Sequence, residues 1–157
     1  MEEKTVRIIL PETEEISTLR HSDGISYINY EEFKVKYPHH PNEKISGDSK
    51  YVVKNLDGSS STEFPLELNA YSSFSHPCIH KPKAWTYDKD NAKFYMVSKR
   101  GKNIYKAYAD EDIKIEEIIS DIMSAIAFLN YNGYAHGDIK PDNIIYYKGK
   151  AKLIDMG

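Results

Sequence analysis

Two short stretches near the end of the chain are the most informative: His136-Gly137-Asp138-Ile139-Lys140-Pro141-Asp142-Asn143 and Asp155-Met156-Gly157. In the first stretch, Lys140 lies two residues after Asp138 and Asn143 lies five residues after it. Carboxylate and amide oxygens are ligands that Mg²⁺ prefers, and a lysine beside them can offset negative charge on a phosphate. This combination of carboxylates, an amide and a lysine at close spacing marks the stretch as a candidate functional site.

The first stretch resembles the catalytic loop H-R-D-x-K-x-x-N of the protein kinases, and the second resembles their metal-binding turn D-F-G. The resemblance implies that Asp138 orients a substrate hydroxyl and accepts its proton, and that Lys140 offsets charge on the transferring group. It also implies that Asn143 and Asp155 bind Mg²⁺. A lysine at position 140 is the form found in serine/threonine kinases. Gly137 replaces the usual arginine, so we do not expect control by an activation-loop phosphate bound there.

The upstream half of the chain carries further similarities to this family. Tyr51-Val52-Val53-Lys54 resembles V-A-I-K, which implies that Lys54 binds the α- and β-phosphates of ATP and that Val52 contacts the adenine. The spacing of Glu67 from His76-Pro77 implies that its carboxylate forms an ion pair with Lys54, with Glu63 as a competing partner.

The glycine-rich phosphate loop of the family is poorly represented. At the place where we expect G-x-G-x-x-G, the sequence is Ser22-Asp23-Gly24-Ile25-Ser26-Tyr27, with Gly24 as its single glycine. Fewer glycines allow fewer close approaches of the backbone to phosphate. We therefore expect weak nucleotide binding.

The residue pattern predicts both strands and helices. Runs of β-branched and aromatic residues between turn residues indicate strands at 5–10, 25–37, 51–54, 83–87, 92–99, 144–147 and 151–154. Apolar residues at steps of three and four predict an amphipathic helix over 110–132 that ends at Asn132-Gly133. A shorter helix is expected over 63–74, with Pro65 in its first turn.

The order of these elements predicts an α+β protein with a protein-kinase-like fold. A strand-rich part with one helix comes first, and a long helix and a hairpin follow Gly101. By the resemblance, residues 1–97 form an N-terminal β-sheet lobe, residues 98–103 a hinge, and residues 104–157 the start of a helical C-terminal lobe.

Composition argues against several other classes of protein. The net charge of −3 offers no basic excess for a nucleic-acid backbone, and Cys78, the single cysteine, excludes a disulfide scaffold. No apolar run approaches the roughly 18 residues that a membrane-spanning helix needs. We therefore expect a cytoplasmic protein that binds neither nucleic acid nor a membrane.

The reaction implied by the resemblance is transfer of a phosphoryl group from Mg²⁺-bound ATP to a serine or threonine hydroxyl of a protein substrate. Two alternatives stay open. Small-molecule kinases of the aminoglycoside and choline type share an H-G-D-x-x-x-x-N loop, which Gly137 fits, although Lys140-Pro141 favours protein kinases. The other alternative is a catalytically silent kinase fragment that acts as a binding module or decoy.

The sequence stops at Gly157, directly after the Asp-x-Gly turn. The kinase fold carries an activation segment and further helices beyond that turn. We therefore expect little protein kinase activity from these residues alone. We also expect the isoleucine-rich face of the helix over 110–132 to be covered by self-association or by a partner, because large exposed apolar patches mark interaction surfaces.

Overall fold

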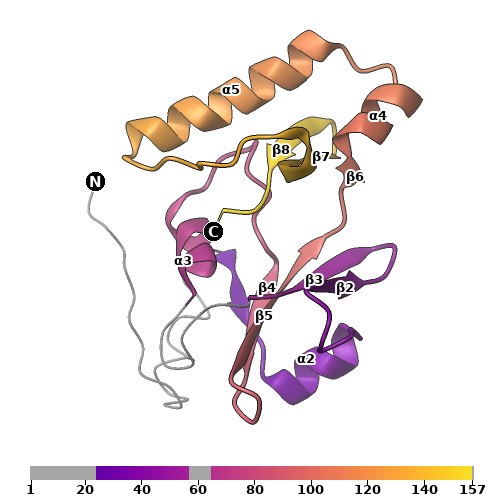
Figure 1. The fold of residues 1–157 in the computed structure, drawn as a ribbon, viewed down its shortest axis with the longest axis vertical. Coiled ribbons are helices and arrows are strands. Elements are labelled where there is room, and N and C mark those ends of the chain that lie inside the picture. Colours follow the sequence, from indigo (N-terminus) through magenta and orange to yellow (C-terminus); the bar gives the residue numbers. More distant parts are fainter. Residues whose placement is uncertain (1–23, 57–64, 157) are drawn as a thin grey trace. The chain divides into compact units, whose positions relative to one another are not determined.

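The computed structural model describes residues 24–56 and 65–156 (Figure 1). Within these ranges the chain divides into two compact units. Residues 24–56, 65–73 and 81–100 form one, here called the sheet unit, and residues 74–80 and 101–156 form the other, here called the helical unit. The strand expected over residues 5–10 lies outside the described residues.

A five-stranded sheet is the framework of the sheet unit. Its strands are β1 (Ser26–Tyr27), β2 (Ile45–Gly47), β3 (Tyr51–Asn55), β4 (Ala84–Asp88) and β5 (Lys93–Lys99). They are arranged in the order β1-β4-β5-β3-β2, and every neighbouring pair is antiparallel except the parallel pair of β1 and β4. β2 and β1 are therefore the two edge strands, and β3 lies next to β2.

Helices α2 (Tyr30–Lys36) and α3 (Leu66–Ser73) lie on opposite faces of this sheet. Successive residues of a strand point to opposite faces. Phe33 and Tyr37 at the end of α2 pack in a buried cluster with Val53 of β3, whereas Glu67 of α3 contacts the neighbouring residue Lys54. We call the side of β3 that carries Val53 the α2 face, and the side that carries Lys54 the Lys54 face.

The prediction of a strand over residues 25–37 is wrong beyond the first few residues, because α2 occupies most of that range. The Asn29 side chain caps the helix by accepting a hydrogen bond from the backbone N–H of Glu31 at 2.9 Å. Phe33 and Tyr37 are four residues apart and both are buried. That spacing is helical. The aromatic residues in this range are so frequent that they also match the alternating pattern of a strand.

The helical unit contains two helices, a short 3-10 turn and a small antiparallel sheet. These elements are β6 (Lys102–Asn103), α4 (Ile104–Asp110), α5 (Ile115–Tyr131), η2 (Pro141–Asn143), β7 (Ile144–Tyr147) and β8 (Lys150–Leu153). The sheet has the order β6-β7-β8. Residues 74–80, which we expected in the first lobe, belong here because Cys78 O accepts from Leu153 N at 2.8 Å and His80 N donates to Leu153 O at 2.9 Å.

The helix expected over 110–132 begins later than predicted, at Ile115. Asp110 instead ends α4, and Glu111 has an extended conformation that closes that helix. Acidic side chains are unfavourable at the negative end of a helix and favourable at the start of the next one, which is consistent with a break in the acidic run. The predicted end is confirmed: Asn132 is the C-cap of α5, and Gly133 has a φ of 76°.

The apolar residues of α5 face two ways. One stripe is buried and consists of Ile118, Ile122, Ala125 and Leu129. A second stripe, here called the outer stripe, consists of Ile115, Ile119 and Met123, whose exposed fractions are 47%, 55% and 59%. In the described ranges, no helix combines the length and the apolar character needed to cross a membrane.

Candidate active site

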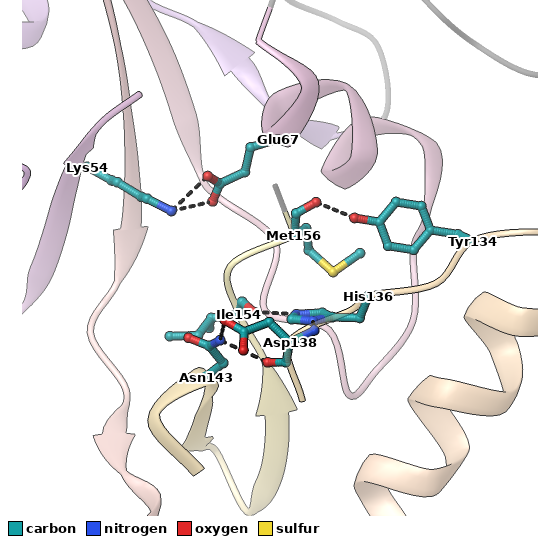
Figure 2. Close-up of polar contacts among 8 residues, drawn as sticks. All are labelled: Lys54, Glu67, Tyr134, His136, Asp138, Asn143, Ile154 and Met156. Atoms are coloured by element: carbon teal, nitrogen blue, oxygen red, sulfur yellow. Dashed lines mark hydrogen bonds and ion pairs between the residues drawn. The ribbon is translucent and has the colours of Figure 1, made fainter. Parts of the chain in front are cut away.

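Lys54 and Glu67 form a close ion pair in the sheet unit (Figure 2). Lys54 Nζ lies 2.7 Å from Glu67 Oε1 and 2.9 Å from Oε2, so both carboxylate oxygens accept from it. The two side chains are only 14% and 10% exposed. The expected pairing is confirmed, whereas its competitor Glu63 lies outside the described residues.

The local sequence explains how α3 presents Glu67. Pro65 precedes the first residue of the helix, where its missing N–H has no cost. Glu67 lies in the first helical turn, where a carboxylate interacts favourably with the exposed N–H groups. Leu68 and Tyr71 of the same helix are buried, so packing restricts the rotation of α3 and with it the direction of Glu67.

Val52 lies on the Lys54 face, two residues before Lys54 on the same strand. Its partner across β2 is Gly47, which has no side chain, and Val52 is half-buried. An apolar surface next to the lysine is therefore present, as the resemblance implies for adenine.

Gly24 is not brought to this site. It lies two residues before β1, which pairs with β4 at one edge of the sheet. Strands β4 and β5 separate β1 from β3, which carries Lys54. The expectation that Gly24 belongs to a loop over the phosphates finds no support in this arrangement.

In the helical unit, Asn143 holds together residues 136–143, which resemble the catalytic loop of kinases and are here called the catalytic loop. Its Nδ2 donates to the backbone oxygen of Asp138 at 2.9 Å and to Asp138 Oδ2 at 3.0 Å (Figure 2). Asn143 is only 6% exposed, which favours a fixed orientation. Because Nδ2 is used in this way, Oδ1 is the atom with which Asn143 can bind a cation.

Lys140 is the second residue that contacts Asp138. Its Nζ lies 3.5 Å from Asp138 Oδ2, and the two side chains are 50% and 58% exposed. An exposed pair of this kind adds little stability. The Lys140–Asp138 pair instead places an exposed carboxylate and a cation side by side, where both are accessible to a substrate.

His136 connects the catalytic loop to the chain after β8. Its Nε2 donates to the carbonyl oxygen of Ile154 at 2.9 Å, and its Nδ1 accepts from the Asp138 N–H at 3.2 Å. These partners require the neutral ring with its proton on Nε2. His136 therefore hydrogen-bonds within its own loop, to Asp138, and outside it, to Ile154. Between His136 and Asp138, Gly137 has a φ of 81°, a conformation that glycine adopts at little cost.

Asp155 is held by the residues on either side of it. Ile154 N donates to Asn143 O at 3.0 Å, and the Tyr134 hydroxyl donates to Met156 O (Figure 2). Met156 itself is 1% exposed. Asp155 has a φ of 64°, in the left-handed region that aspartate enters more readily than most residues.

These contacts bring Asp138, Lys140, Asn143 and the backbone next to Asp155 together. Asn143 and Asp155 offer an amide oxygen and a carboxylate, which are hard donors that suit Mg²⁺. The donor chemistry therefore fits the metal that the resemblance implies. Sequence reasoning did not find Tyr134 or Ile154, because one acts through its hydroxyl and the other through its backbone, and neither belongs to a recognisable motif.

Behind α5, His76 and Cys78 form part of the packing of the helical unit. His76 Nδ1 accepts from Cys78 N at 3.0 Å, and His76 Nε2 donates to Ser124 Oγ at 3.2 Å. Burial, with a smaller effect from Lys150, lowers the pKa of the His76 imidazole. Burial and the nearby carboxylate of Asp121 raise the pKa of the Cys78 thiol.

The family model described as the protein kinase domain matches residues 40–157. The chain therefore belongs to the protein kinase family. This match includes β3, α3 and the whole catalytic loop, and it agrees with the α+β fold expected from the sequence.

Named relatives agree with this assignment. The chain is 29% identical over 98 residues to cyclin-dependent kinase F-3 of Oryza sativa subsp. japonica, covering 58% of this chain and 22% of the relative. It is 29% identical over 120 residues to a putative serine/threonine-protein kinase of Acanthamoeba polyphaga mimivirus, covering 68% of this chain and 43% of the relative. The chain thus spans less than half the length of either relative.

Solved structures support the fold. A twitchin kinase fragment from C. elegans, described as an autoregulated protein kinase with immunoglobulin domains, matches 90% of this chain and 36% of its own length. Its TM-score is 0.60 at 17% sequence identity, which is evidence for a shared fold.

Proposed function

We propose that this chain supplies the residues for transfer of the γ-phosphoryl group of Mg²⁺-bound ATP to a serine or threonine hydroxyl of a protein, at the low rate expected of these residues alone. The observation that carries the proposal is the double hydrogen bond from Asn143 Nδ2 to Asp138, at 2.9 and 3.0 Å. It orients a carboxylate that is 58% exposed and open to a substrate. Lys140 and the serine/threonine kinases among the relatives support the choice of acceptor.

The side chains divide the work of the reaction. Asp138 accepts the proton of the attacking hydroxyl, whose oxygen forms a bond to the γ-phosphorus while the bond to the β-phosphate oxygen breaks and ADP leaves. Lys140 offsets charge on the transferring group. Lys54 binds the α- and β-phosphates, and Glu67 orients Lys54. Asn143 Oδ1 and Asp155 would hold Mg²⁺, which would neutralise phosphate charge.

The proposal is tested by ³²P transfer from ATP to a mixed serine/threonine protein substrate. We expect Asp138→Asn to lower the rate by at least about 100-fold, since a positioned general base contributes that much. Asp142→Asn is the matched control, because Asp142 is an exposed carboxylate of the same loop and is expected to change the rate little. Transfer that is insensitive to Asp138→Asn contradicts the proposal.

The same assay separates the alternatives. Transfer to amino-alcohol or aminoglycoside acceptors, with none to protein, identifies a small-molecule kinase, which the glycine conformation of the His136-Gly137-Asp138 loop also suits. Binding of nucleotide without transfer to any acceptor identifies a binding module.

A further inference from the structure

The segment that leads into β2 joins the sheet beside Lys54. β2 is the edge strand beside β3, and its Ile45 is paired with Lys54. Just before it, Lys44 O accepts from Asn55 N at 2.8 Å. Residues 38–44, here called the lead-in segment, therefore join the sheet at the level of Lys54. A loop that covers phosphates bound by Lys54 is expected at this position.

The composition of the lead-in segment is unsuited to binding phosphate. Its sequence is Pro38-His39-His40-Pro41-Asn42-Glu43-Lys44. Loops that cradle phosphate use backbone N–H groups, and glycine lets the backbone approach closely because it has no Cβ. The segment has no glycine, and its two prolines have no N–H to donate. Glu43 and Lys44 carry opposite charges, so the segment offers no net positive charge to phosphate.

Several of the remaining N–H groups are already used within the segment and by β2. His40 N donates to Ser46 Oγ at 3.2 Å. Asn42 N donates to His40 Nδ1 at 3.3 Å, and Glu43 N donates to His40 O at 3.2 Å. A phosphate at this place has to break these bonds before it can accept from the same groups.

The segment is also fastened to the α2 face. Pro41 O accepts from Asn55 Nδ2 and from the Tyr95 hydroxyl, both at 3.3 Å, and from Lys93 Nζ at 3.4 Å. Asn55 is one residue after Lys54 on β3, so its side chain points to the opposite face. Tyr95 is the cross-strand partner of Asn55 and shares that face.

Packing of His39 adds to this attachment. Its ring centroid lies 4.8 Å from that of Tyr95 and 5.7 Å from that of Phe33. Its Nδ1 donates to Tyr37 O at 2.8 Å. The middle of the lead-in segment is thus held on the α2 face, away from the Lys54 face.

We propose that the sheet unit binds adenine nucleotides without a backbone cradle for their phosphates, and that the lead-in segment does not close over the nucleotide. This inference rests on the proposed function, because it concerns how the same lysine site binds ATP. Lys54 still contacts phosphate, whereas the lead-in segment adds nothing for the γ-phosphate. Only Lys140 and Mg²⁺ then favour ATP over ADP, so binding discriminates weakly between the two nucleotides, and ADP competes effectively with the substrate.

Two measurements on the full chain test the inference. In calorimetric titrations with Mg²⁺, we expect ATP and ADP to bind with affinities within about threefold of each other. A charge-assisted hydrogen bond from a backbone N–H to the γ-phosphate would favour ATP by about tenfold or more, and the lead-in segment does not supply one. In hydrogen exchange, we expect saturating Mg²⁺–ATP to leave the amides of His40, Asn42 and Glu43 no better protected than adenosine does.

A designed variant provides a gain of function. Pro38→Gly, His40→Gly and Glu43→Gly together place glycines at the spacing G-x-G-x-x-G with three substitutions. We expect at least about tenfold tighter ATP binding, with adenosine binding unchanged. The matched control carries alanine at the same three positions, which removes the same rings and charge without the freedom of glycine, and we expect it to gain less than about threefold.

The outcomes separate this inference from the proposed function. An unaltered chain that binds ATP more than about 30-fold tighter than ADP, or whose lead-in amides are protected by ATP alone, overturns the inference and leaves the proposed function standing. An equal gain from the alanine control also overturns it, because removal of the rings and the charge, and not the freedom of glycine, is then the cause. No binding of adenosine, ADP or ATP refutes the inference and the proposed function together.

Discussion

Replacement of Lys54 by methionine is expected to destabilise the sheet unit strongly. The substitution keeps an unbranched side chain but removes the ammonium group that contacts both oxygens of Glu67, at 2.7 and 2.9 Å. The carboxylate stays 90% enclosed without its lysine, since the Glu67 side chain is only 10% exposed. Removing one partner of a buried pair costs about 3–5 kcal/mol. The partial exposure of this pair places the expected loss of unfolding free energy at about 3 kcal/mol.

Urea unfolding followed by tryptophan fluorescence measures this loss. Trp85 is the single tryptophan, is 2% exposed and belongs to β4 of the same unit, so its emission reports the unfolding of the sheet unit. Lys34→Met is the matched control. Lys34 also pairs with a glutamate, Glu31, at 3.1 Å, but that pair is exposed, and its removal should change the unfolding free energy far less.

The double variant Lys54→Met/Glu67→Leu completes the test. It removes both charges, so we expect it to recover about half or more of the stability that Lys54→Met loses. A loss from Lys54→Met no larger than that from Lys34→Met, or a double variant less stable than Lys54→Met alone, refutes the reasoning that Lys54→Met leaves an uncompensated buried charge on Glu67.

Three further predictions concern the helical unit. The pKa of His76 is lowered in the folded protein, so the unfolded protein binds a proton more readily and stability should decrease as the pH drops below about 6.5. We expect the urea midpoint to be lower at pH 5.5 than at pH 7.5, and this difference to be much smaller in His76→Gln. Cys78 is 3% exposed with a raised pKa, so a thiol reagent at pH 7.5 should label it only after unfolding, and labelling at the rate of a free cysteine contradicts this. The outer stripe should cause self-association in light scattering, which Ile119→Glu should reduce and the adjacent exposed change Ser120→Glu should not; a monomeric unaltered chain contradicts it.

Much of the candidate site could be predicted because it depends on short separations along the chain. Most of the proposed catalytic residues lie within eight positions, from His136 to Asn143, and the resemblance to kinases implies their roles. The pair of Lys54 and Glu67 is more distant in sequence, yet a strand and a helix with recognisable signals place it. The resemblance to kinases supplied the register between them.

Two secondary-structure predictions were wrong because the pattern of residues alone does not decide between the competing structures. The range 25–37 was assigned to a strand because alternation and helical spacing overlap where aromatic residues are dense, and only packing of Phe33 and Tyr37 decides between them. The break between Asp110 and Ile115 depends on how two helices end and begin, which the apolar pattern alone does not show.

The sequence by itself determined which groups are candidates for the chemistry, because the order and spacing of Asp138, Lys140, Asn143 and Asp155 are properties of the chain. Only the tertiary structure decided which glycines and loops lie beside Lys54. Gly24 lies at the far edge of the sheet and the lead-in segment at the near one, because strand order is set by contacts between residues distant in sequence. The direction taken by the lead-in segment was likewise decided by packing, since Tyr95 and Asn55 hold it on the α2 face.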